Sequence, residues 1–549
     1  AEPRALSHAQ WLPIESKIRK VLSIASGVPE SSIEKSSTIF ELGLDSISGI
    51  KVAALLKKQS VKLAVSDMLR AGTIENMAKA ANSNQTEFSL TNISSILHES
   101  LNGTNVAELL RSHGIDSQRV RKVFPATAGQ VYFLSMHAVN PRVFYPEFYY
   151  VASRKLSPEV LDRAWARVID QTPMLRTAFV PTSGSPLLPY MQIEFEAVNI
   201  PVIWHSKFDR HLVSRSLKQE FGAVPVALHA CQTNKGTALI LQIHHALYDA
   251  VSLPHILDRL VTHCSQEEVA KPNPDLELSQ LVAFQHVHSP VDVRRQFWQK
   301  YLGQMPTAVK RGDGFGSVQH HYRPGLVSNM TSVEKVAKRQ GLSIQTVFLA
   351  VYARVHLQEL DAAETIDDAG SRRRLTVGLY LANRSHSIEG LAESMVPTVN
   401  IVPLRLDDKL SDSNDTLLDA ARRIQTEINK ISRPEYSGVS LLEIAEWTGV
   451  RIDTCVNFLR LPEQELKAPS NGDQVKFALT AIQREEFEDL SGAAPVSEKD
   501  SIPINGNGVA PPGAAETSPG LEHPSASTAQ NIFLVSGRMH ITSACYQGD

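Results

Sequence analysis

Two adjacent histidines and a nearby aspartate are the residues of this chain best suited to acid–base chemistry. His244 and His245 end a strand-like apolar run over residues 238–243, and Asp249 follows four residues later. Ser252 then opens a segment whose apolar residues recur at helical spacing. A loop held by a strand on one side and a helix on the other can keep an imidazole in one orientation, as a general base requires.

The same residues also admit plainer interpretations. A histidine beside an apolar strand is often only structural. A spacing of four residues could place two metal ligands together, but a zinc site normally draws three protein ligands, and no further Cys or His stands at a suitable distance. We therefore expect no metal here. Asp249 is expected to be a buried carboxylate that pairs with an arginine and orients the loop without touching a substrate.

The string from His244 to Asp249 resembles the HHxxxDG motif of condensation domains in nonribosomal peptide synthetases, which are chloramphenicol acetyltransferase-like acyltransferases. Other strings resemble further motifs of that family and stand in the family's order. They occupy residues 123–130, 171–179 and 395–400 and, more weakly, 433–436 and 456–458. A strand that ends in a polar loop is also predicted over 377–384. The resemblance thus runs from residue 120 to about residue 460.

A second chemical motif stands near the N-terminus, where Gly43, Asp45 and Ser46 precede an amphipathic segment. Gly43 allows a turn and Asp45 is a good N-cap, so Ser46 falls on the first turn of a helix. The free N–H groups and the positive dipole end of a helix start suit a phosphodiester attached there. Taken alone, an Asp-Ser pair more often marks a simple cap.

The surroundings of Ser46 favour the functional interpretation. An apolar stripe over residues 14–25 stops at Gly27, as a first helix would, and residues 65–69 and 74–81 are predicted as two short helices. Residues 8–82 therefore resemble a thiolation domain, the all-α four-helix carrier of peptide synthetases. The resemblance implies a covalent 4'-phosphopantetheine on Ser46, added by a phosphopantetheinyl transferase.

The resemblance to condensation domains implies a two-lobed α/β fold with the active site between the lobes. We expect a linker over 83–119 that packs against a neighbour and is helical near 106–113, a first lobe over 120–290 and a second lobe over 291–549. A polar helix over 291–302 marks the boundary. Residues 492–530 are rich in Gly, Pro, Ser and Ala, so a flexible insertion is predicted there, between strands over 475–482 and 532–541.

The resemblance also implies a role for each site residue. A carrier-bound acyl or peptidyl group would pass to an amine or hydroxyl nucleophile. His245 would accept a proton or a hydrogen bond from that nucleophile, and His244 would shape the loop. Asp249 would hold the loop through Arg176, which lies in a Leu-Arg-Thr string like that of the family's second motif. Ala250 stands where the family usually has glycine, and its methyl group would either narrow the donor channel or be tolerated.

Length and composition agree with several soluble globular domains. The chain has 549 residues, 42% of them hydrophobic and 21% charged, with 55 basic against 58 acidic side chains. This near balance gives no reason to expect a nucleic-acid or anionic-membrane partner. No apolar run reaches the ~20 residues needed to span a bilayer. Four widely spaced cysteines without a C-x-x-C pair predict reduced thiols and a cytoplasmic setting.

Three other functions compete with simple condensation. An epimerisation domain shares the histidine pair, but the Glu-Gly-His-Gly-Arg-Glu-like string that supplies its second acid–base residue is not found here. A catalytically silent docking or scaffold module would be favoured had His245 been replaced. A terminal, macrocyclising domain of a fungal synthetase, or a tail module of a siderophore synthetase, stays a serious rival, because the carrier stands without an adenylation motif. Expected partners are upstream adenylation and condensation modules, with a downstream carrier as a further candidate.

Overall fold

Apolar residues spaced three and four apart give the N-terminal segment its helices and a small core of its own. In the computed structural model these are α1 (Pro13–Ser26), the short η1 (Glu30–Ser32), α2 (Ser46–Lys58) and α4 (Ile74–Ser83). Ile18 and Leu22 of α1 are fully buried against Val52 and Leu56 of α2. The helix ends at Gly27, whose φ of 72° is a left-handed conformation that glycine adopts without strain.

The structure describes most of the chain. The described residues are 11–37, 46–61, 73–83, 93–101, 103–139, 144–182, 189–208, 222–265, 276–303, 318–327, 330–340, 342–363, 374–384, 394–407, 416–450, 454–460, 479–481, 528–535 and 538–546, together with isolated positions between these stretches. The short helix predicted over 65–69 and most of the insertion predicted over 492–530 lie outside them. The helix predicted over 74–81 is confirmed as α4.

Two short helices follow and pack against the body of the molecule, as predicted for the linker. They are α5 (Ile93–Ser100) and α6 (Val106–Ser112). Asn105 caps α6 by accepting a hydrogen bond from the backbone N–H of Glu108. Leu109 and Leu110 of α6 are buried in a cluster with apolar residues of the first lobe.

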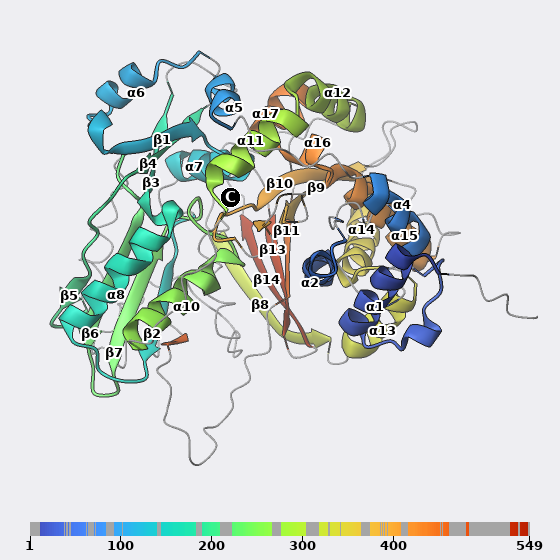
Figure 1. Ribbon diagram of the computed structural model, residues 1–549. Helices are drawn as coiled ribbons and strands as arrows, with labels where there is room; N and C mark the ends of the chain where they lie inside the picture. The colour runs from blue at the N-terminus through green and yellow to red at the C-terminus, as the bar shows by residue number, and fades with distance from the viewer. Residues whose placement is uncertain are drawn as a thin grey trace, which may run out of the picture.

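The first lobe is built from two sheets and the helices that cover them (Figure 1). Its elements are η3 (Ser117–Arg119), β1 (Val120–Pro125), α7 (Ala128–Val139), β2 (Glu147–Ala152), α8 (Pro158–Gln171), η4 (Pro173–Arg176), β3 (Thr177–Pro181), β4 (Tyr190–Phe195), β5 (Ile203–His205), β6 (Val226–Gln232), β7 (Thr237–Ile243), α10 (Ser252–Ser265) and α11 (Leu278–His288). Strands β1, β4 and β3 form a three-stranded sheet in that order. The larger sheet contains β2, β7, β6 and β5 in that order, and apolar residues of α8 and α10 pack on one of its faces.

The polar helix predicted over 291–302 is present with the same bounds, and the part of the body from this helix onwards is called the second lobe here. Its elements are α12 (Val291–Leu302), β8 (Val318–Val327), α13 (Met330–Arg339), α14 (Ile344–Ala363), β9 (Arg374–Leu381), β10 (Asn400–Asp407), α15 (Leu417–Ile431), α16 (Pro434–Ser437), α17 (Leu441–Thr448), β11 (Thr454–Arg460), β12 (Leu479–Ala481), β13 (Thr528–Val535) and β14 (Arg538–Tyr546). Six of these strands form one sheet in the order β10-β9-β11-β13-β14-β8.

Two features of the second lobe differ from the sequence-based expectation. The single strand predicted over 532–541 is two antiparallel strands, because β13 ends at Val535 and β14 begins at Arg538. The second difference concerns β12, which leaves its own lobe and pairs with β2, so that the larger sheet of the first lobe has the order β12-β2-β7-β6-β5.

The lobes also share a core of their own around α7. Tyr132, Phe133 and Met136 of this helix are buried together with Ile401 and Leu441 of the second lobe. Helix α7 comes so close to β10 that a Cβ atom on Gly129 would lie 1.9 Å from the Val399 carbonyl oxygen, so only glycine fits there.

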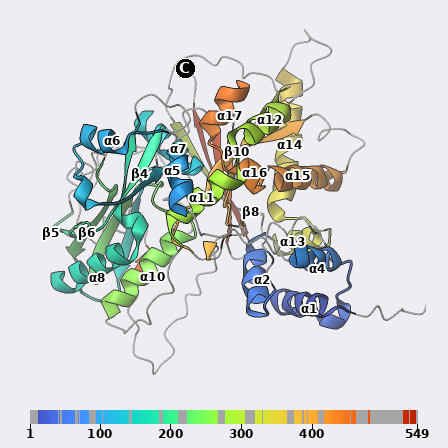
Figure 2. The same cartoon turned by 45° about the horizontal axis from the view of Figure 1, so that its top comes forward.

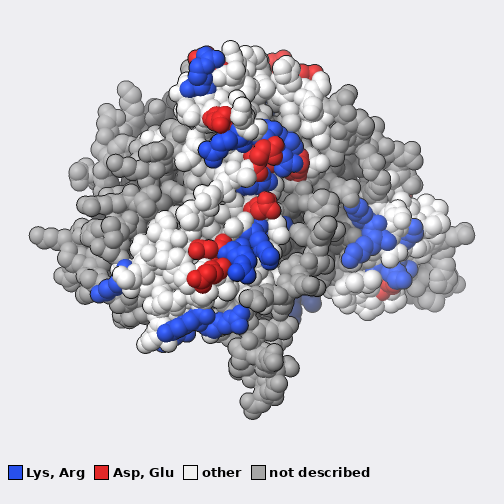
Figure 3. All heavy atoms as spheres, turned by 60° about the vertical axis from the view of Figure 1, so that its left-hand side comes forward, with Lys and Arg blue, Asp and Glu red and all other residues white. Residues whose placement is uncertain are grey.

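The N-terminal helices lie beside the second lobe, next to α13, in both ribbon views (Figures 1 and 2). Basic and acidic side chains are interspersed across the middle of the exposed first-lobe face (Figure 3), as the balanced composition predicts. Among the described residues, no helix combines the length and apolar character that a bilayer crossing demands.

Candidate active site

The histidine pair lies in the loop between β7 and α10, as the sequence predicts. All seven residues of β7 are buried, which fixes the start of the loop. The backbone N–H of His244 donates to the Pro225 carbonyl at 3.0 Å, and that of His245 donates to the Phe144 carbonyl at 2.8 Å. The main chain of both histidines is therefore held by segments that precede β6 and β2.

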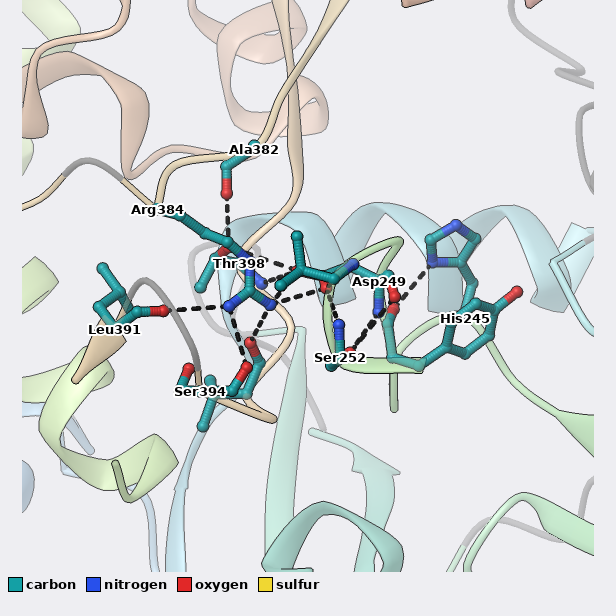
Figure 4. A network of polar contacts seen from close by, with 11 residues as sticks. His245, Asp249, Ser252, Ala382, Arg384, Leu391, Ser394 and Thr398 are labelled. Atoms are coloured by element: carbon teal, nitrogen blue, oxygen red, sulfur yellow. Dashed lines mark hydrogen bonds and ion pairs between the residues drawn. The ribbon is translucent and has the colours of Figure 1, made fainter. Parts of the chain in front are cut away.

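The His245 ring is oriented as a general base should be. Its Nδ1 lies 3.1 Å from the Tyr248 carbonyl oxygen, which can only accept a hydrogen bond, so Nδ1 carries the proton and Nε2 is left as the acceptor. Nε2 points away from the Asp249 network (Figure 4). The residue is partly exposed to solvent. Burial of the ring lowers the pKa of His245, which keeps the imidazole neutral near pH 7.

His244 is fully buried. Its Nδ1 accepts the backbone N–H of Ala246 at 3.1 Å, a contact that tightens the loop. Its ring meets the ring of His137 almost perpendicularly, with centroids 4.8 Å apart. Burial, together with the neighbouring His137, holds the pKa of His244 well below its usual range, so this residue is a neutral part of the loop's framework.

The expected pair between Asp249 and Arg176 is wrong, because Asp249 pairs with Arg384 of the second lobe (Figure 4). One guanidinium nitrogen of Arg384 lies 2.7 Å from Oδ1 and 2.8 Å from Oδ2 of Asp249. Oδ1 also accepts the backbone N–H of Ser252 at 2.9 Å and thereby caps α10. Burial alone would raise the pKa of Asp249, but the Arg384 charge and the hydrogen bonds from Thr398 and Ser252 lower it below the usual range.

Arg384 belongs to a second-lobe segment, residues 382–398, that we call the strap. Its guanidinium also donates to the carbonyls of Leu391, Ser394 and Val396 at 2.9–3.0 Å. The strap's Thr398 adds a backbone N–H bond to Asp249 Oδ2 at 3.0 Å. Leu391 and Val396 pack into the core of the first lobe. The histidine loop, residues 244–251, is therefore fastened to the second lobe through one buried carboxylate.

Arg176 lies elsewhere and holds a different hairpin together. It is buried and donates to the carbonyls of Phe195 and Glu196 at 2.8 and 2.9 Å. Its guanidinium lies 3.7 Å from Glu194, a carboxylate that also pairs with Arg121. Arg176 thus fixes the β3–β4 hairpin.

The sequence interpretation missed the part that Gln130 plays. This buried side chain accepts the backbone N–H of Thr127 and donates to Gln192 and, at 2.9 Å, to the Ala246 carbonyl inside the loop. The signal was present in the 123–130 string, in which a glutamine stands on an otherwise apolar helix start. A glutamine in that setting needs buried partners, and a tight loop with free carbonyls provides one.

The remaining predicted positions are placed as follows. Ser46 is the first residue of α2, as predicted, so its backbone lies at a helix start that suits a phosphodiester; its side chain lies outside the described part of the structure. Ala250 is exposed. In the part of the chain that the structure describes, no three His, Cys, Asp or Glu side chains gather as a metal site would need.

Comparison with known proteins agrees with this geometry. Residues 16–81 match the family model described as phosphopantetheine attachment site, and residues 120–489 match that described as condensation domain. The nonribosomal peptide synthetase sidC of Arthroderma benhamiae is 38% identical over 469 residues, which cover 84% of this chain and 9% of that protein. A hydroxamate-type ferrichrome siderophore peptide synthetase of Schizosaccharomyces pombe is 28% identical over 450 residues, covering 79% of this chain and 8% of that protein.

One solved structure illustrates the shared fold. The condensation domain of the monacolin K polyketide synthase MokA superposes with a TM-score of 0.53 at 12% identity, covering 78% of this chain and 93% of that one. At this identity the likeness shows the fold alone. The chain spans about a tenth of the length of the two curated relatives named above.

Proposed function

This chain belongs to the condensation-domain family of nonribosomal peptide synthetases, with a phosphopantetheine-attachment domain in front, and on that premise we propose that it transfers an acyl group carried at Ser46 to an amine nucleophile. The observation that carries the proposal is the open Nε2 of His245. Its partner nitrogen is already committed to the Tyr248 carbonyl, so the ring has one site free to take a proton. The amine would displace the thiol that carries the acyl group, so that the C–S bond breaks, an amide forms and the thiol is left free on the carrier.

Ser46 would hold the prosthetic group. It stands at the start of α2, where unpaired backbone N–H groups and the helix dipole favour a phosphodiester. When bound, 4'-phosphopantetheine supplies the thioester by which the acyl group is carried. A phosphopantetheinyl transferase is the partner that would install it, and other modules of the same synthetase would charge it.

Each residue of the histidine loop would then have a separate role in the transfer. His245 accepts the proton of the incoming amine at Nε2, which is worth about 10²- to 10⁴-fold in rate. His244 holds the loop from its buried side, and Asp249 holds it through Arg384. Bringing two tethered reactants together contributes more, about 7–11 kcal/mol, so the structure is expected to favour positioning over strong basicity.

Phosphopantetheinylation tests the role of Ser46. Incubation with a broad-specificity phosphopantetheinyl transferase and coenzyme A is expected to add one phosphopantetheine mass to the chain, as measured by intact-protein mass spectrometry. Ser46→Ala should remain unmodified, whereas the neighbouring Ser48→Ala, two residues along α2, should still be modified. The same mass addition on Ser46→Ala would refute the assignment.

Product analysis tests the reaction itself. The chain loaded with a triglycyl group at Ser46 is offered the glycine thioester of N-acetylcysteamine, the corresponding glycolic acid thioester, or no acceptor. We expect a linear amide product with the amine acceptor, detected by mass spectrometry and absent from the other two reactions. Ester formed from the hydroxyl acceptor as the main product would contradict the choice of nucleophile.

A terminal, ring-closing role is the second candidate, and the names of the relatives are compatible with it. Two similar proteins are named as a sidC synthetase and a ferrichrome siderophore synthetase. In the same experiment, a cyclic peptide released in the reaction without acceptor would support macrocyclisation and overturn linear condensation. A catalytically silent scaffold would give no product in any of the three reactions.

A further inference from the structure

Two aromatic rings enclose the imidazole of His245. Phe133 of α7 lies against one face, with ring centroids 4.3 Å apart and planes tilted by 23°. Tyr248 of the loop itself lies 4.6 Å from the His245 ring centroid with a tilt of 17°. Both rings are thus stacked on His245, whereas Phe144 meets it only edge-on at 6.1 Å.

Neither ring is free to move away. Phe133 is 1% exposed and packs tilted against Phe144 at 4.9 Å and edge-on against Tyr132 at 5.7 Å. Tyr248 is buried and meets Phe148 edge-on at 5.6 Å. Since close-packed interiors resist rotation of such rings, the space between them is fixed in width.

Phe133 is also aligned with the other contact that α7 makes to the loop. Gln130 stands three residues earlier, so the two side chains lie on one face of the helix. Gln130 holds the Ala246 carbonyl, and Phe133 covers the adjacent imidazole. One helix face therefore sets both the main chain of the loop and the plane of the His245 ring.

The apolar enclosure, rather than nearby charges, has the main influence on the pKa of the His245 imidazole. Asp249, whose charge is met by Arg384, is the charged group on the same loop. His244 is neutral, and the rings of two further titratable side chains, His137 and Tyr145, contact His244. Burial is the largest cause of the lowered pKa of His245.

We propose that Phe133 and Tyr248 form an aromatic clamp that positions the His245 ring, keeps water from its two faces and leaves only the Nε2 edge open to the nucleophile. This inference rests on the proposed role of His245 as the base. Phe133 is a positioning residue, because it touches the imidazole and acts through it. The clamp has a consequence for selectivity: a ring held in one plane aims Nε2 at the bound amine, whereas a loosened ring would also activate water against the thioester, so the clamp favours transfer to the amine over hydrolysis.

Leucine variants test the clamp. Phe133→Leu and Tyr248→Leu each remove one stacked ring while retaining an apolar side chain. Phe179→Leu is the control, because Phe179 is as buried as Phe133 but belongs to β3 and makes no ring contact with His245 that the structure records. With the triglycyl donor and the glycine thioester acceptor, we expect kcat to fall about tenfold or more in both clamp variants and the share of hydrolysed donor to rise. The control should keep both values near those of the unmodified sequence.

The titration of His245 gives a readout that does not depend on turnover. Opening one face to water relieves the burial that lowers the pKa, so the pKa of His245 should move upward in both clamp variants, as followed by NMR of protein labelled with ¹³C in the histidine rings and assigned with His245→Gln. The low-pH limb of kcat should move upward with it. A pKa and a hydrolysis share equal to those of Phe179→Leu in both variants would overturn the clamp. If the clamp exists but His245 is not the base, His245→Ala should keep full activity while the pKa of His245 still shifts in the clamp variants.

Discussion

Replacing His245 by alanine is expected to slow amide formation by about 10²- to 10⁴-fold and to leave the loading of Ser46 unchanged. The variant loses the proton acceptor at Nε2 but keeps the neighbouring His244 and the Asp249–Arg384 pair, which hold the loop. Single-turnover transfer from loaded Ser46 to the glycine thioester, sampled by mass spectrometry, measures the effect. His255→Ala, on the helix that follows the loop, is the control and should transfer at the ordinary rate.

The pH dependence of the rate of amide formation also tests whether His245 is the base. Because burial lowers the pKa of His245 below its ordinary 6.5, the base form persists as the pH falls through the usual histidine range. Apart from the ionisation of the acceptor amine, which is common to all variants, the rate is therefore expected to be flat near pH 7 and to fall only at lower pH, when Nε2 becomes protonated. This limb should disappear in His245→Ala, and equal turnover by that variant would remove the base from the mechanism.

Removing either partner of the Asp249–Arg384 pair is expected to have the largest effect on stability. Both side chains are almost fully buried, at 6% and 1% exposure, so Asp249→Ala leaves a buried guanidinium without its counter-ion and should cost about 3–5 kcal/mol in the free energy of unfolding. Arg384→Ala should cost at least as much, since the three strap carbonyls lose their donor as well. Chemical denaturation followed by fluorescence measures both, alongside transfer activity.

An exposed ion pair on α15 provides the comparison for that measurement. Asp419 and Arg422 lie one turn apart and are about half exposed, so Arg422→Ala should leave the free energy of unfolding nearly unchanged. The pKa of Asp249 is depressed in the folded protein, so its stabilisation is present above the ordinary carboxyl range and lost as the pH falls through the folded pKa. An Asp249→Ala variant as stable as Arg422→Ala would argue against the structural role of the pair.

Local patterns in the sequence predicted the local parts of the site correctly. The strand before His244, the helix after Ser252 and the helix over 291–302 follow from apolar periodicity and end residues, which act over a few positions. The position of Ser46 at a helix start follows in the same way. Each of these features is decided by neighbours in the chain.

The errors concern partners that are distant in the chain. Arg176 and Arg384 are both buried arginines near family-like strings, and nothing in either string says which one meets Asp249, 135 residues before Arg384. The choice is made by the strap, whose Leu391 and Val396 prefer the first-lobe core and carry Arg384 with them. The pairing of β12 with β2 is of the same kind, because three residues of strand carry no mark of the sheet that they will join.

The pairing of β12 with β2 limits where the chain can be divided when modules of a synthetase are exchanged. A fragment that ends near residue 290 would keep the histidine loop but lose Arg384. It would also lose the three residues of β12 that pair with the edge of β2, so unpaired backbone groups would be exposed there and would promote aggregation. The two halves of the body are thus interlocked rather than merely adjacent. Chimaeric synthetases that keep the histidine loop intact should place their junctions beyond Tyr546, because β13 and β14 lie inside the second-lobe sheet.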